Sequence, residues 1–135
     1  MDQAQTKMEL FKKGYNCGQI IAALLGDVCG LDRQVAFSGM VGMCDSCGPN
    51  CSTLRGGAQC IGLYCRGNAT DCASAKERAE KMIAALNSAF QNKHGSLLCS
   101  DLRKGDMMAC AGYVDTVVDA VTELVQQDKA AQTVT

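Results

Sequence analysis

The chain has 135 residues, with 13 basic and 14 acidic side chains and a formal net charge of -1. Single hydrophobic cores commonly serve about 100 to 200 residues, so we expect residues 1–135 to form one compact domain. Basic residues are interspersed with acidic ones, which argues against nucleic acid as a partner. Because the N-terminus lacks the apolar core of a secretory signal and no apolar run approaches the ~18 residues of a membrane span, we expect a cytoplasmic protein with no membrane partner.

The apolar residues recur with a helical period from the start of the chain. Hydrophobic residues make up 47% of the sequence, but there are only three Phe, three Tyr and no Trp, which favours close-packed helices. The pattern predicts a first helix over residues 3–13, ended by Gly14. A second helix follows, with Asn16 as its N-cap, and runs up to Gly30.

The rest of the chain continues this pattern, so the predicted fold is an all-α bundle of six or seven helices. The further helices are expected from Asp32, from Cys51 to Cys65 with Asn50 as cap, over residues 70–93 up to Gly95, from Ser96, and over residues 109–127. Those over 70–93 and 109–127 should be the longest.

Two adjacent glycines, Gly56 and Gly57, fall inside the helix expected after Cys51. Each costs about 1 kcal/mol relative to alanine in a helix interior. They indicate either the close approach of another backbone or bulky inorganic group, or an interruption of the helix.

Ten cysteines are the most unusual feature of the composition, and five of them lie between residues 40 and 67. Cys44, Cys47 and Cys51 form a CxxCxxxC motif, whose spacing allows several sulfurs from one loop to meet one metal or cluster. Stable disulfides are rare in a reducing cytoplasm, so metal ligation or catalytic thiols explain the composition better.

Four cysteines fall at or near the start of separate predicted helices: Cys17, Cys51, Cys99 and Cys110. An iron-sulfur cluster of the 4Fe-4S type bound by four thiolates is anionic, and helix N-termini supply the amide donors and dipoles that stabilise it. Zinc could use the same thiolates, although structural zinc sites usually contain paired short knuckles. Cys44 and Cys47 are the next candidate ligands. They would either replace one of these four cysteines or help to hold a second or larger cluster.

The remaining cysteines are ambiguous at the level of sequence. Cys29, at the end of the second predicted helix, is expected to pack as a small apolar residue. Cys60 lies roughly opposite Cys51 on a helical wheel, so it and Cys65 are either core residues or ligands of a separate site with Cys72. The single histidine, His94, is interpreted as a polar residue near a helix C-terminus.

Four motifs, taken in order, resemble those of the C_GCAxxG_C_C family of redox-active proteins. They are GYNCGQ around Cys17, Cys51 with Gly56 five residues on, HGSLLCSDL around Cys99, and Cys110. The resemblance implies a small helical protein with four redox-competent cysteines, and a related helical domain occurs in split-Soret cytochromes. It does not imply haem, since the chain lacks a CxxCH motif. In the second motif this chain reads CSTLRG, with Ser52 and Thr53 where the family usually has Gly and Ala.

The expected function is therefore that of a cysteine-rich iron-sulfur protein in electron transfer or reductive chemistry. Its partner would be a redox protein or a small-molecule electron acceptor. Two alternatives stay open: a metal-free thiol-disulfide oxidoreductase, and a metal or metalloid carrier without turnover. The sequence leaves open the cluster type, the electron donor and the oligomeric state, a homodimer included.

Overall fold

A computed structural model describes residues 3–32, 34, 38, 51–67, 71–98, 102 and 107–133. This part of the chain contains no β-strand, which confirms the all-α prediction. Its five helices are α1 (Gln3–Lys12), α2 (Cys17–Cys29), α4 (Ser52–Gly67), α5 (Cys72–His94) and α7 (Met107–Thr133).

The expected count of six or seven helices differs from the five in the described residues. The short helix predicted from Ser96 lies largely outside the described residues, among which residues 96–98 are not helical and Leu102 is, with its N–H donating to the Leu98 carbonyl at 3.1 Å. The Ser96 hydroxyl accepts from the backbone N–H of Leu98 at 3.1 Å, and the Leu97 carbonyl accepts from Cys51. The short helix predicted after Asp32 lies largely outside the described residues.

The helix ends agree with the capping residues in the sequence. Asn16 caps α2, and its side chain accepts from the Gln19 N–H. Gly14, Gly30 and Gly95 follow α1, α2 and α5, all with positive φ. With 23 and 27 residues, α5 and α7 are the longest helices described, as predicted.

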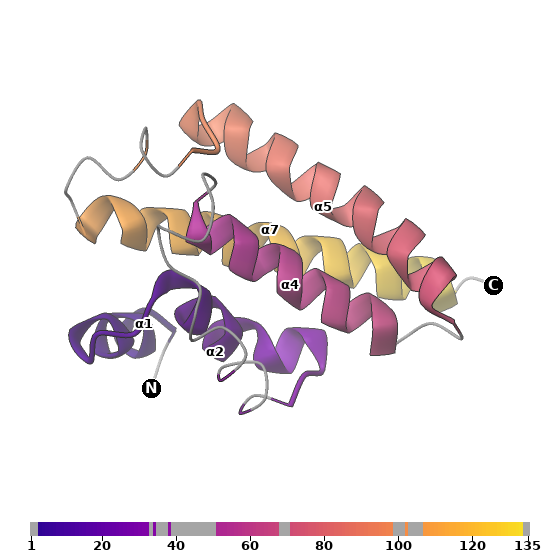
Figure 1. The fold of residues 1–135 in the computed structure, drawn as a ribbon, viewed down its shortest axis with the longest axis horizontal. Helices are drawn as coiled ribbons and strands as arrows, with labels where there is room; N and C mark the ends of the chain where they lie inside the picture. The colour runs from indigo at the N-terminus through magenta and orange to yellow at the C-terminus, as the bar shows by residue number, and fades with distance from the viewer. Residues whose placement is uncertain are drawn as a thin grey trace.

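Helix α4 lies at the centre of the bundle, in contact with α2, α5 and α7, while α1 packs against α2 (Figure 1). Helices α2, α4 and α7 run in the same general direction and α5 runs the opposite way (Figure 1). The first turns of α2, α4 and α7 are consequently gathered at one end of the bundle, together with the last turn of α5.

Gly57 allows α4 to occupy this central position. A Cβ atom at Gly57 would come within 2.6 Å of Val117 Cγ1, closer than real Cβ contacts allow, and within 3.2 Å of Leu86 Cδ2, which is tighter than most of them. The helix passes through both glycines without interruption. The predicted close approach is thus correct, but the neighbours of Gly57 are side chains of α7 and α5.

The core is aliphatic, with cysteine and few aromatic rings. Four valines at helical spacing, all with no exposed surface, form the inner stripe of α7: Val114, Val117, Val121 and Val125. Leu86 and Phe90 contribute the facing stripe of α5. Tertiary packing thereby outweighs the weak helix propensity of valine. None of the helices in the described ranges is both long and apolar enough to cross a bilayer.

Candidate functional site

The candidate site is the end of the bundle where α2, α4 and α7 begin (Figure 1). The first amides of each helix have no partner within the helix, and its N-terminus carries a partial positive charge of about half an elementary charge. Three such ends at one pole of the molecule favour an anionic group between them.

Cys17 is the first residue of α2 and is partly exposed. A capping box fixes the turn that carries it: Gln19 N donates to Asn16 Oδ1 at 2.8 Å, and Asn16 N donates to Gln19 Oε1 at 3.2 Å. The Cys17 backbone is therefore held in a defined conformation at the helix start, as the sequence predicted.

Cys51 occupies the cap position of α4, since its carbonyl accepts from Arg55 N at 3.1 Å. The sequence had placed this cap one residue earlier, at Asn50, which lies outside the described residues. Cys51 N donates to the Leu97 carbonyl at 2.8 Å, and only 5% of Cys51 is exposed. The start of α4 is thus tied to a segment that carries Cys99 two residues further on.

Helices α2 and α4 touch through two glycines beside these cysteines. A Cβ atom at Gly56 would lie 2.9 Å from Gly18 Cα, so the two backbones are in direct contact. Gly18 follows Cys17 directly, and Gly56 is five residues after Cys51, about 7.5 Å along a helix axis. This contact holds the two cysteine-bearing helix starts beside each other.

The first turns of α7 are anchored by contacts from two other segments. Tyr113 donates its hydroxyl to the Leu102 carbonyl at 2.8 Å. From α1, the buried Lys7 ammonium bonds Asp115 Oδ1 at 2.6 Å and the Ala111 carbonyl at 3.5 Å. Cys110 is the fourth residue of α7, next to these anchors, although its side chain is outside the described part.

His94 ends α5 at the same pole and is held as a neutral ring. Thr116 Oγ1 donates to the Gly112 carbonyl at 3.2 Å, so its 2.8 Å contact with His94 Nε2 requires the histidine nitrogen to donate. Burial, and secondarily the nearby Lys93, lower the pKa of His94. The His94 ring also packs edge-on against the Tyr113 ring, with 4.7 Å between the ring centroids. The interpretation of His94 as a polar residue at a helix C-terminus is confirmed.

One buried side chain at the start of α4 has an unsatisfied polar atom. Thr53, two residues after Cys51, has no exposed surface, and its Oγ1 makes no hydrogen bond within the described structure. Buried hydroxyls are nearly always paired, so an orphaned one beside the candidate site suits a site that holds a further group. In the sequence, Thr53 is distinguished only as a departure from the usual motif, and nothing there indicates a role for Lys7.

Three cysteines belong to the core: Cys29, as expected, and Cys60 and Cys65, which the sequence left open. Cys29, Cys60 and Cys65 are 3%, 0% and 0% exposed. Burial raises the pKa of Cys29 to about 11 and that of Cys60 to about 12, and it raises the pKa of Cys65 as well. Thiols of this kind stay protonated at neutral pH and pack as small apolar groups. Cys72 is exposed at the first residue of α5 and does not share their environment.

The described side chains include two of the six candidate ligands, Cys17 and Cys51. Cys44, Cys47 and Cys99 lie outside the described residues, as does the side chain of Cys110. Among the described side chains, no three His, Cys, Asp or Glu residues gather into a metal-binding group. The convergence of the four helix-start cysteines stays a prediction.

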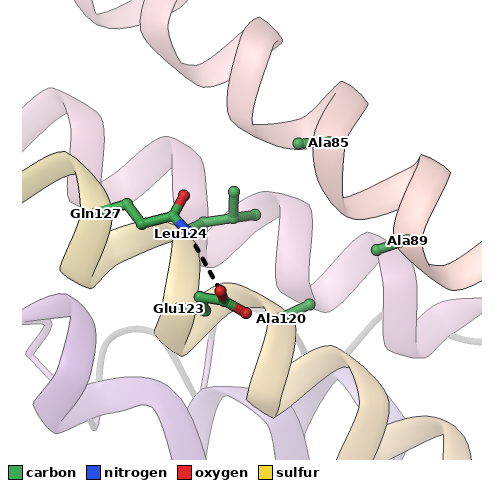
Figure 2. Close-up of a pocket in the computed structure, with 6 residues that line it drawn as sticks. All are labelled: Ala85, Ala89, Ala120, Glu123, Leu124 and Gln127. Carbon is green, nitrogen blue, oxygen red and sulfur yellow. Dashed lines mark hydrogen bonds between the residues drawn. The ribbon is translucent and has the colours of Figure 1, made fainter.

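A hollow between α5 and α7 is separate from this site (Figure 2). Its lining consists of short or apolar side chains and one hydrogen-bonded pair, in which Gln127 Nε2 donates to Glu123 Oε1 at 3.2 Å. The lining residues are Ala85, Ala89, Ala120, Glu123, Leu124 and Gln127. Since none of these is a thiol, the hollow does not take part in cysteine chemistry.

The chain matches a known protein family. The model of the family described as "Putative redox-active protein (C_GCAxxG_C_C)" matches residues 15–124, which include all six candidate ligands. No curated protein and no solved structure matches the chain.

Proposed function

Because the chain belongs to the C_GCAxxG_C_C family, we propose that it is a cytoplasmic redox protein that binds an iron-sulfur cluster of the 4Fe-4S type or larger. The leading ligands are Cys17, Cys51, Cys99 and Cys110. Cys44 and Cys47 complete the set, either as replacements for one of these ligands or as ligands of a second or larger cluster.

The observation that carries the proposal is the backbone contact between Gly18 and Gly56. It brings the start of α2, with Cys17, beside the start of α4, with Cys51. A cluster bound by thiolates is anionic, and two adjoining helix N-termini offer it N–H donors and favourable dipoles. The orphaned Thr53 hydroxyl is a further donor at the same place. The residues described at this pole therefore fit such a group.

When bound, the cluster supplies reversible one-electron chemistry. It would pass electrons from an external donor to a redox protein or a small-molecule acceptor. The chain's own residues hold and shield the group: Cys51 is almost fully buried, whereas the partly exposed Cys17 marks the side nearer to solvent. We expect electrons to pass on the Cys17 side.

Anaerobic purification followed by iron, acid-labile sulfide and zinc analysis tests this function. We expect iron and sulfide in equal amounts, and visible absorption that bleaches reversibly with dithionite. Metal-free protein with a titratable dithiol would instead select the thiol-disulfide oxidoreductase. Bound metal without a reversible redox wave would select the carrier.

A matched pair of variants connects the chemistry to the site. Cys51→Ser should lose most of the iron and sulfide, because it removes a buried ligand at the cap of α4. Cys72→Ser removes an exposed thiol at the start of α5 and should keep both. Equal metal content in the two variants would contradict the assignment of Cys51.

A further inference from the structure

We propose that the Thr53 hydroxyl donates a hydrogen bond to a sulfur of the cluster held at Cys51 and thereby raises its reduction potential. This inference rests on the proposed function and adds a residue that sets the potential of the site. Thr53 acts through the cluster sulfur and ligates no iron.

The first observation is the state of the hydroxyl. Thr53 has no exposed surface, and its Oγ1 is the buried side-chain oxygen that lacks a partner in the described structure. The fold does satisfy another buried threonine: the Thr116 hydroxyl, at 8% exposure of the residue, donates to Gly112 and accepts from His94. A group that binds at the start of α4 would give the Thr53 hydroxyl the partner that it lacks.

The second observation is where Thr53 lies on α4. Residues three and four positions apart share one face of a helix, so Thr53 shares a face with Gly56 and Gly57. Gly56 contacts α2 at Gly18, and Gly57 contacts α7 at Val117. Thr53 is one turn earlier on this face, on the side where α2 and α7 also begin (Figure 1). It therefore lies on the face of α4 that packs against the two other cysteine-bearing helices, α2 and α7.

The chemistry follows from charge. Reduction adds one electron to the cluster and makes its sulfurs better hydrogen-bond acceptors. A fixed O–H donor consequently stabilises the reduced form more than the oxidised form, and hydrogen bonds to sulfur are among the factors that set cluster potentials. The added electron comes from the external donor, and the hydroxyl keeps its proton throughout.

Anaerobic redox titration of the cluster-loaded Thr53→Val variant tests the proposal. Valine keeps the shape of the side chain and deletes the hydroxyl. We expect the ratio of reduced to oxidised cluster at a fixed potential to fall about tenfold, which lowers the one-electron midpoint potential by about 59 mV. Thr53→Ser, which keeps the hydroxyl, should restore a potential close to that of the parent protein.

Tyr64→Phe is the matched control, because it also deletes a buried hydroxyl from α4. Tyr64 lies eleven residues after Thr53 on α4, and its hydroxyl donates to Asp128. Loss of the Tyr64 hydroxyl should therefore leave the reduction potential unchanged. An unchanged potential in a fully loaded Thr53→Val variant would overturn the inference and leave the proposed function intact. Parent protein without iron and sulfide would instead overturn the proposed function, and this inference with it.

A second deletion variant distinguishes hydrogen bonding by the Thr53 hydroxyl from a purely structural role of the side chain. If valine hinders loading, Thr53→Ala removes the hydroxyl with a smaller side chain. Cluster loss in both deletion variants, with retention in Thr53→Ser, would support a direct contact with the hydroxyl. Equal loss in all three variants would show that only the threonine shape matters and would overturn the proposal.

Discussion

Gly56 of α4 and Gly18 of α2 lie so close that a Cβ atom added at Gly56 would come within 2.9 Å of Gly18 Cα. The obstacle is backbone, which cannot rotate away as a flexible side chain can. The absence of a side chain at Gly56 therefore allows the two helices, and the cysteines at their starts, to lie against each other.

Gly56→Ala should separate α2 from α4. Overpacking typically costs about 1 to 3 kcal/mol, so we expect a loss of this size in the free energy of unfolding, measured by urea denaturation, with lower iron content after anaerobic loading. Gly62→Ala is the control, because a Cβ at Gly62 meets nothing within 4 Å. It should be neutral or stabilising by up to about 1 kcal/mol, since alanine favours the helix. Equal behaviour of the two variants would contradict the close contact as the cause.

Tyr64→Phe should weaken the bundle at the pole opposite the candidate site. Tyr64 donates to Asp128 Oδ2 at 2.7 Å, and Arg78 pairs with the same carboxylate oxygen, so three helices meet there. Loss of a hydrogen bond to a charged group costs about 1.5 to 3 kcal/mol. Chemical denaturation should report this loss while iron content stays at the parent level. A simultaneous loss of iron would show that the two poles are coupled.

Alkaline pH should destabilise the fold through its core thiols. The pKa of Cys60 is raised from 9.0 to about 12 by burial, so above pH 9 the unfolded chain releases the proton while the folded chain keeps it. The free energy of unfolding should therefore fall between pH 9 and 12, at up to about 1.4 kcal/mol per pH unit for a single such group. Cys60→Ala should show a shallower decline in urea denaturations across this range. An identical slope would assign the effect to other groups.

The loop pair should affect chemistry more than structure. We expect the Cys44→Ser, Cys47→Ser double variant to keep its helicity in circular dichroism, since the long apolar stripes supply a core without these residues. Its iron and sulfide content and its reduction potential should change. Unfolding together with metal loss would identify both cysteines as structural ligands, and unchanged metal content and potential would exclude them from the site.

The helices were predictable because their signals are local. Asn16 marks the start of α2 and Gly30 its end, within one residue of the observed bounds. The β-branched stripe of α7 was also recognised as helical from its period alone. Gly56 and Gly57 predicted a close approach, but the sequence could not name Gly18 or Val117 as the neighbours.

Interactions across long sequence distances were not predictable. The Lys7–Asp115 pair spans 108 positions, and nothing near Lys7 distinguishes it from the exposed Lys12. Burial likewise shows that Cys60 and Cys65 are core residues, because their spacing alone allowed either packing or ligation. The burial of the Thr53 hydroxyl and its lack of a partner depend on tertiary packing, which a motif does not specify.

The Lys7 contact also bears on the order of events during synthesis. Domains fold largely as units as the chain emerges from the ribosome, at about 5 to 20 residues per second. The Lys7 ammonium, on the first helix, can reach its partners Ala111 and Asp115 only after the start of α7 has emerged. The start of α7, with Cys110, can therefore join the starts of α2 and α4 only late in synthesis, and on the proposed function the cluster would be completed only after translation of that segment. A nascent chain arrested before residue 111 should accordingly retain no iron.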